Sequence, residues 1–184
     1  INSSAGKNPV TVPPDVVQVT AFALRAASLT DGNFSIALGP LVDLWGINTD
    51  KAHVPDKAEL DGVRDLIDWR DVLLDEKNGT VFLKKAGMKL NYGGIVKGFA
   101  ADEIVKILKE SSVKKAVVDL GGNIYVFGRK DNGDPWKVGV KNPADPGSEP
   151  IKGLSMGEGS VVTSGAYERF FEQDGKKYHH ILDP

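Results

Sequence analysis

The residues best suited to chemistry lie between positions 91 and 102, where two glycines precede a lysine. Gly93 and Gly94 stand between a predicted strand and a helix predicted to run to about Glu110. Glycines there let a ligand approach the backbone, and the first helical turn offers unpaired N–H groups and a positive dipole end. Because Lys97 adds a full positive charge, the pattern favours a phosphate-bearing ligand. A tight turn beside a solvated lysine explains the same spacing, since the stretch matches neither a Walker loop nor a G-x-G-x-x-G fingerprint.

Two further groups of polar side chains lie near the end of the sequence. Thr163 and Ser164 precede a glycine and are candidate donors to a phosphate or a ring carbonyl, although an ordinary turn explains them equally well. His179 and His180 fall on a predicted strand, so their side chains are expected on opposite faces, which lets one of them face a site, although an ordinary structural role on the strand is the simpler explanation for each. No His-x-x-x-His pair occurs, so the sequence offers no zinc motif of that kind.

Length and composition are those of an ordinary globular chain. The 184 residues are 41% hydrophobic and 26% charged, enough for one domain with a sizeable core. A net charge of -2 gives no reason to expect nucleic acid or a membrane surface as a partner. The absence of cysteine excludes disulfides, a thiolate metal site and a cysteine nucleophile. Since the sequence does not begin with Met, we expect a piece of a longer protein.

The elements expected around these residues mix helices with hairpins. Helices are predicted over 14–30, 57–67 and 95–110, and strands over 72–74, 80–83, 88–90, 116–120, 123–127, 136–140, 151–155, 160–162, 168–172 and 177–181. Asn-Gly or Asp-Gly pairs at 78–79, 132–133 and 174–175 are expected to close hairpins. Residues 1–14 are predicted to be a loop or arm, and 33–46 a buried connection. The predicted fold class is α+β, a mixed or antiparallel sheet with hairpins packed against a few helices.

Four segments, in this order, carry a more specific signal. They are Asp31-Gly32-Asn33-Phe34 with Gly39–Gly46, the stretch Asn91–Asp102, the motif Asp119-Leu120-Gly121-Gly122-Asn123, and Thr163-Ser164-Gly165 with His180-Ile181-Leu182-Asp183-Pro184. The ordered set resembles the FAD:protein FMN transferase family, also called ApbE and once assigned to thiamine biosynthesis. The resemblance covers residues 1–184, which we therefore expect to be a single fragment of that family's catalytic domain.

The resemblance implies a bacterial enzyme that works outside the cytoplasm, often with a lipid anchor. Such an enzyme uses FAD and magnesium to move FMN onto a threonine of an acceptor flavoprotein, with release of AMP. Some relatives instead hydrolyse FAD to FMN and AMP, and a non-catalytic FAD-binding protein is a further alternative. No nucleic-acid partner is implied, and membrane contact is expected only through an anchor outside these residues.

The resemblance also assigns roles to individual positions. It implies FAD contacts at Asn33, Phe34, Ser35, Asn91, Lys97 and Leu182, to which the candidate donors Thr163 and Ser164 are added, a magnesium-ligating carbonyl at Gly94, and hydroxyl activation by His180. The family commonly has Asp at positions 35 and 91, so a carboxylate is missing at each. The family also has an N-terminal segment and a C-terminal metal motif that residues 1–184 lack. Without them we expect this piece to bind magnesium and FAD poorly.

Overall fold

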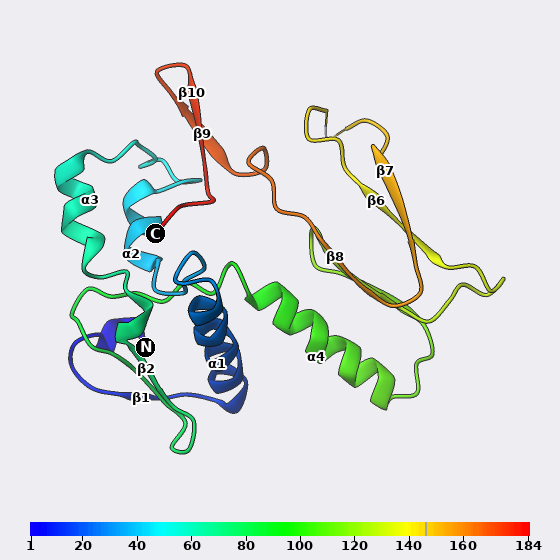
Figure 1. Cartoon of the computed structure of the whole chain (residues 1–184), viewed down its shortest axis with the longest axis horizontal. Helices are drawn as coiled ribbons and strands as arrows, with labels where there is room; N and C mark the ends of the chain where they lie inside the picture. Colours follow the sequence, from blue (N-terminus) through cyan, green and yellow to red (C-terminus); the bar gives the residue numbers. More distant parts are fainter. Residues whose placement is uncertain (146) are drawn as a thin grey trace. The chain divides into compact units, whose positions relative to one another are not determined.

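The computed structural model describes residues 1–145 and 147–184, which form two compact units (Figure 1). The first unit contains Ile1–Ile95 and Glu168–Pro184, and the second contains Val96–Tyr167. Each unit combines helices with antiparallel strands, so the predicted α+β class is confirmed. No helix within the described residues is both long enough and apolar enough to cross a bilayer.

Two small antiparallel sheets and three α-helices make up the described part of the first unit. Its elements are η1 (Asn2–Ser4), β1 (Val10–Thr11), α1 (Pro14–Leu29), α2 (Gly39–Trp45), α3 (Lys57–Arg64), η2 (Trp69–Asp71), β2 (Val72–Asp75), β3 (Thr80–Leu83), β9 (Phe170–Gln173) and β10 (Lys176–His179). One sheet has the order β1-β3-β2, and β9 pairs with β10 in a hairpin. The predicted turn at Asn78 and Gly79 joins β2 to β3, with Gly79 at φ 63°.

The core of the first unit lies between this sheet and α1. Val81 and Leu83 alternate with partly exposed neighbours along β3 and are almost completely buried. They belong to a cluster that also includes Ala23 of α1 and Ile36. This alternation follows from the two-residue period of a strand with one covered face. The core thereby fixes the segment around Ile36, which carries three of the predicted binding residues.

Residues 1–14 are mostly loop, as predicted, but they are held to the unit, because β1 pairs with β3 and the Asn2 carboxamide both donates to Leu90 O (3.2 Å) and accepts from Leu90 N (2.9 Å). One strand predicted for the first unit is wrong. Residues 88–90 form no regular strand and make a single parallel bridge, Leu38 to Lys89. The Asn2 side chain supplies hydrogen bonds that a neighbouring strand would otherwise supply.

The segment 33–46 is also more regular than predicted, because α2 occupies Gly39–Trp45. Pro40 lies in the first turn, where its missing N–H costs no hydrogen bond, and Gly46 ends the helix at φ 56°. Leu41 is buried as expected. Trp45 is only partly buried, and its ring lies 5.8 Å from that of Tyr178 in β10.

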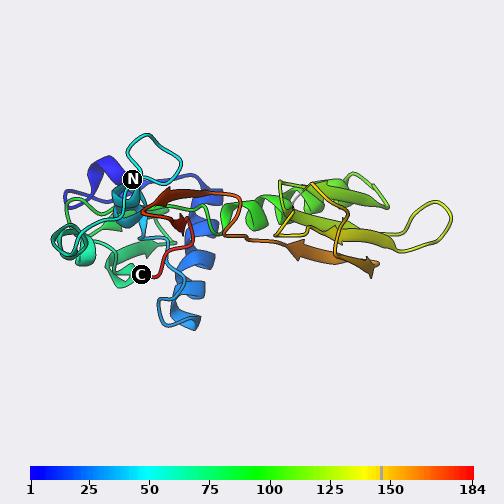
Figure 2. The ribbon, with the colours of Figure 1, turned by 90° about the horizontal axis from the view of Figure 1, so that it is seen from above.

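The second unit contains one long helix and two antiparallel sheets. Its elements are α4 (Val96–Glu110), β4 (Ala116–Asp119), β5 (Asn123–Phe127), β6 (Trp136–Val140), β7 (Lys152–Met156) and β8 (Gly159–Val162). One sheet has the order β4-β5-β8, and β6 pairs with β7. Helix α4 lies along the first sheet, where Ala101 and Val105 pack with Val118 and Phe127 (Figure 2).

The prediction that Asn132 and Gly133 close a hairpin is wrong, because the strands before and after them, β5 and β6, do not pair with each other. Strand β6 pairs with β7, the next strand along the chain, whereas β5 pairs with β4 and β8. Gly133 does form a turn, since its N–H donates to Lys130 O. An Asn-Gly pair therefore marks the chain reversal correctly but does not determine which strands become neighbours.

Candidate functional site

The first predicted binding segment begins where α1 ends. Thr30 Oγ1 donates to Ala26 O (2.9 Å) and accepts from Phe34 N (3.0 Å), so one hydroxyl holds the end of the helix to the segment. Asp31 and Gly32 have positive φ (50° and 87°), which reverses the chain. Phe34 is thereby brought against the core of the first unit and is partly buried.

The two polar neighbours of Phe34 differ in exposure. Asn33 is exposed, and its Nδ2 donates to Thr30 O at 2.9 Å. Ser35 is 7% exposed, and its Oγ accepts from Ala37 N at 3.1 Å. Asn33 therefore presents surface to a ligand, whereas the Ser35 side chain is occupied in shaping its own turn. Their predicted role in FAD binding stays a prediction.

The second predicted segment, around Asn91, lies directly beside the first. Asn91 N donates to Ile36 O at 2.8 Å, and Gly39 N donates to Lys89 O at 3.1 Å. The Asn91 side chain closes the following turn, because its Oδ1 accepts from Gly93 N at 2.8 Å. An amide oxygen performs this task as a carboxylate does. The asparagine at this position therefore keeps the loop geometry while giving up a negative charge.

Gly94 joins the two segments. A Cβ built on Gly94 would lie 3.0 Å from Phe34 Cε2, closer than almost all real contacts of that kind. A Cβ on Gly93 would lie 2.9 Å from Asn91 Oδ1. Both glycines are exposed, so the loop offers bare backbone at the point where the Phe34 ring meets it. Backbone of this kind permits the close approach that the sequence predicted.

Tyr92 holds this loop to helix α1. The buried Thr20 donates its one hydroxyl proton to Val16 O (2.6 Å), so the Tyr92 hydroxyl must donate to Thr20 Oγ1 at 2.7 Å. Burial raises the pKa of Tyr92, which keeps the phenol protonated and able to donate. A chain of two hydrogen bonds thus fixes the residue immediately before the glycines.

The two adjacent histidines have different proton arrangements. Strand β10 ends at His179, so the prediction that both lie on a strand is wrong. The partly buried His180 places Nδ1 3.3 Å from Arg169 O, and because a carbonyl can only accept, Nδ1 carries the proton. Nε2 of a neutral His180 therefore keeps a lone pair and can act as a base. In the exposed His179, Nδ1 itself accepts from Ile181 N at 3.3 Å.

A pocket of about 300 Å³ lies within the first unit beside Asn33. Its lining consists of Asp31, Gly32, Asn33, Arg64, Ile67, Asp68, Trp69, Arg70, Asp183 and Pro184. The buried Trp69 Nε1 has no hydrogen-bond partner among the described residues. Arg70 lies 4.9 Å from the centre of the Trp69 ring and 3.5 Å from an Asp31 oxygen. Sequence reasoning missed Trp69 and Arg70, because no local spacing connects them with Asn33.

In the second unit, the Lys97 side chain makes a hydrogen bond to the protein backbone. Its Nζ donates to Gly121 O at 2.9 Å, although the side chain is exposed. An ammonium group has three donors, so two remain for a ligand. The structure therefore joins Lys97 to the Asp119–Asn123 motif, a contact that the sequence did not predict.

The same motif also contacts Thr163. Gly121 and Gly122 have φ of 65° and 82°, and Gly122 O accepts from Thr163 N (2.9 Å) and Thr163 Oγ1 (3.4 Å). Ser164 follows and is exposed. Two predicted FAD contacts, Lys97 and Thr163, thus bind consecutive carbonyls of one glycine turn. The arrangement can present the Lys97 ammonium group to an anionic ligand, whereas the single Thr163 hydroxyl proton is already donated to Gly122 O.

The part of the chain that the structure describes contains neither a cluster of metal-ligating side chains nor a nucleophile elbow. No three His, Cys, Asp or Glu side chains there are placed to hold a metal ion. The exposed Gly94 offers at most one backbone ligand from its position. The Gly-x-Ser-x-Gly sequence at 153–157 passes through β7, whereas a nucleophile elbow needs a strand-to-helix turn.

Comparison with known proteins identifies this combination of fold and motifs. Residues 1–184 match the model of the ApbE family. The ApbE protein of Thermotoga maritima superimposes with a TM-score of 0.90 at 36% identity, covering 100% of this chain and 59% of that one. The flavin transferase ApbE of Vibrio cholerae has a TM-score of 0.82 at 27% identity, covering 99% and 58%. The structure therefore defines an α+β protein of the ApbE type.

Sequence relatives agree with the structural match. Two proteins named FAD:protein FMN transferase, from Klebsiella pneumoniae and Treponema pallidum, are each 43% identical to this chain over its full length. The chain belongs to the ApbE family, as its motifs predicted. It spans 56% and 54% of these two relatives, or about half of their length.

Proposed function

We propose that the intact protein is a flavin transferase that moves FMN from FAD onto a threonine of an acceptor flavoprotein and releases AMP. The relatives at 43% identity carry the name FAD:protein FMN transferase, which supports this activity. The observation that carries the proposal is the contact between Gly94 and the Phe34 ring. It joins two motifs that are far apart in the sequence into one surface of aromatic ring and bare backbone, as a flavin nucleotide requires.

In the proposed reaction, His180 acts as the general base. Its Nε2 takes the proton from the threonine hydroxyl, whose oxygen then attacks the FMN-side phosphorus of FAD. A P–O bond forms to the acceptor, the P–O bond to the AMP phosphate breaks, and AMP leaves with the electron pair. The Nδ1–H bond to Arg169 O supports this role, because it orients the ring with Nε2 free to accept.

Positive charge is needed because this displacement builds negative charge on the diphosphate oxygens. Lys97 supplies one ammonium group held at Gly121 O, and the exposed Ser164 is the remaining candidate hydroxyl donor, because the Thr163 hydroxyl proton is donated to Gly122 O. Magnesium, when bound, would neutralise diphosphate oxygens. Among the described residues, the exposed backbone of Gly94 would be the protein's ligand for that ion, since Mg²⁺ takes few protein ligands where it also binds phosphates.

The test is to incubate the intact protein with FAD, magnesium and a candidate acceptor, then weigh the acceptor and quantify AMP. A transferase gives AMP and modified acceptor in equal amounts. The modified acceptor is heavier than the unmodified one by the mass of FMN less one water. Free FMN with AMP and an unmodified acceptor would instead show an FAD pyrophosphatase. Retention of FAD without AMP would show a non-catalytic binding protein.

We also propose that the protein works outside the cytoplasm and is lipid-anchored through a part of the protein beyond these residues. The family resemblance supports this location. Fractionation of the native cells followed by immunoblotting tests it, and recovery in the soluble cytoplasmic fraction would contradict it.

A further inference from the structure

The Asp119–Asn123 turn is the one recognised motif to which the proposed reaction assigns no task of its own. It connects β4 to β5, and its central residue, Gly121, is bound from both sides. Asp119 Oδ1 accepts from Gly121 N at 2.9 Å, and Lys97 Nζ donates to Gly121 O at 2.9 Å. The carboxylate and the ammonium group are therefore linked through one glycine.

Gly121 needs an external support in order to hold Lys97. It has no side chain, and its φ of 65° lies in the left-handed region, so its conformation is set by the bonds made to its backbone. The Asp119 bond closes the turn before Gly121 in the manner of an Asx turn. The Asp119 side chain therefore helps to set the direction of the Gly121 carbonyl, and with it the position of the Lys97 ammonium group, together with the Leu120 N bond to Asn123 O (2.9 Å).

We propose that Asp119 is a positioning residue that places the Lys97 ammonium group for the FAD diphosphate without touching the substrate itself; this rests on the proposed function. A flexible lysine held in place before binding loses less side-chain freedom when the anion arrives. Since one donor of the ammonium group is used by Gly121 O, the other two remain available to a ligand.

Two substitutions of Asp119 distinguish the effect of the position of its acceptor oxygen from the effect of its charge. Asp119→Asn keeps an acceptor oxygen in place and loses the charge, whereas Asp119→Glu keeps the charge and moves the carboxylate by one methylene. Positioning predicts FAD affinity within about 3-fold of wild type for Asp119→Asn and about 10-fold weaker for Asp119→Glu. The control is Asp131→Asn, since Asp131 is exposed and pairs with Lys115. Affinity is read from the FAD dissociation constant of the intact protein, and circular dichroism checks folding.

A double-mutant cycle then tests whether Asp119 acts through Lys97. In a Lys97→Met background, Asp119→Glu should cause no further loss of FAD affinity, because the group that it positions is gone. An equal loss in both backgrounds, or an affinity for Asp119→Glu equal to that of Asp119→Asn, would overturn the assignment. If the wild-type protein binds FAD and releases AMP but the Asp119 variants do not show the predicted affinities, only the positioning role of Asp119 is refuted. A wild type that neither binds nor cleaves FAD removes the proposed function and this inference together.

Discussion

At the scale of single residues, the structure separates groups that the sequence shows as equivalent. His179 and His180 are adjacent, yet one accepts through Nδ1 and the other donates through it. The sequence shows that His180 is present but not which of its nitrogens carries the proton, since that depends on the carbonyl of Arg169 across the β9–β10 hairpin. Asn91 is similar, because its turn-closing bond follows from local sequence while its contact with Ile36 does not.

His180 gives the first prediction. His180→Ala should lower the rate constant of flavin transfer by about 10²- to 10⁴-fold, because the acceptor hydroxyl loses its base. The FAD dissociation constant should change little. Rapid-quench measurement of AMP release checks the rate, and His179→Ala is the matched control. A His179→Ala variant slower than His180→Ala would contradict the assignment of the base.

Gly94 gives the second prediction. Gly94→Ala places a methyl group about 3 Å from the Phe34 ring, so the ring must move and FAD should bind more weakly. Unfolding in urea should show a loss of about 1 kcal/mol. Gly62→Ala is the control, since a Cβ there meets nothing within 4 Å and alanine favours helix α3. Unchanged FAD affinity in Gly94→Ala would show that the Phe34–Gly94 surface is not used.

At the scale of elements, local patterns predicted most of the helices and strands but few of their partners. Helix α3 was predicted, and its capping box of Asp56 and Glu59 shows why it begins at Lys57. Helix α2 lies inside the predicted buried connection over 33–46, because Pro40 fits the first turn of a helix and the run from Gly39 carries no strong helix signal. The pairing of β6 with β7 depends on packing across a long loop, which no local signal encodes.

The hydrogen bond between α1 and the glycine loop gives the third prediction. Tyr92→Phe should reduce the free energy of unfolding by about 1 kcal/mol, because the partly buried Tyr92 loses its bond to Thr20. Thr20→Val should cost a similar amount. The double variant should cost less than the sum, since both changes remove the same bond. Additive losses in urea denaturation would show that the two hydroxyls are not coupled.

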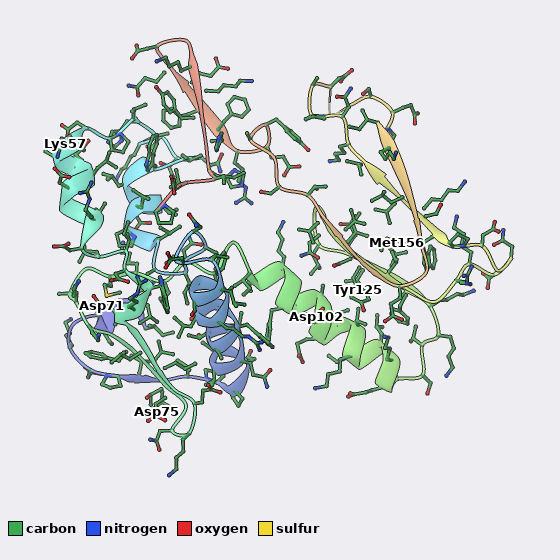
Figure 3. The ribbon with its side chains drawn as sticks, in the orientation of Figure 1. Lys57, Asp71, Asp75, Asp102, Tyr125 and Met156 are labelled. Atoms are coloured by element: carbon green, nitrogen blue, oxygen red, sulfur yellow. The ribbon has the colours of Figure 1, made fainter. Side chains whose placement is uncertain are left out.

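Asp71, the residue immediately before β2, gives a pH-dependent prediction. The Asp71 carboxylate lies 2.7 Å from Lys85 Nζ and 3.1 Å from Lys84 Nζ, and these ammonium groups, Lys85 foremost, lower the pKa of Asp71 below its ordinary 3.8 (Figure 3). A lowered folded pKa stabilises the protein above the unfolded value, and this contribution is lost as pH falls through the folded value.

Asp71→Asn should therefore be less stable than wild type by about 1 kcal/mol at neutral pH, because it lacks the charged contacts. The difference should shrink below about pH 4 as the wild-type carboxylate becomes protonated. Urea denaturation at pH 7 and at stepwise lower pH measures it. Asp75→Asn is a useful comparison at the other end of β2, where the backbone and side chain of Asn78 lower the pKa of Asp75 (Figure 3). A difference in the free energy of unfolding between wild type and Asp71→Asn that grows as pH falls would contradict the predicted pH dependence.

At the scale of the whole molecule, the predicted site residues divide between two compact units. The first unit holds Asn33, Phe34, Ser35, Asn91, Gly94, His180 and Leu182, and the second holds Lys97, Thr163 and Ser164. The ordered motifs predicted the family correctly, because motif order survives where local geometry is ambiguous. They did not predict the Lys97–Gly121 and Phe34–Gly94 contacts, since each joins segments distant in sequence. The chain also spans only about half the length of its relatives, so the proposed activity is assigned to the intact protein.

The most direct test of the account compares two lysines of the same helix in the intact protein. Lys97→Met removes the ammonium group held at Gly121 O, whereas Lys106→Met removes an exposed charge further along α4. The measurement is the rate of AMP release from FAD in the presence of magnesium and acceptor. We predict a loss of at least about 100-fold for Lys97→Met and a rate near wild type for Lys106→Met. Equal rates for the two variants would contradict the claim that Lys97 binds the diphosphate.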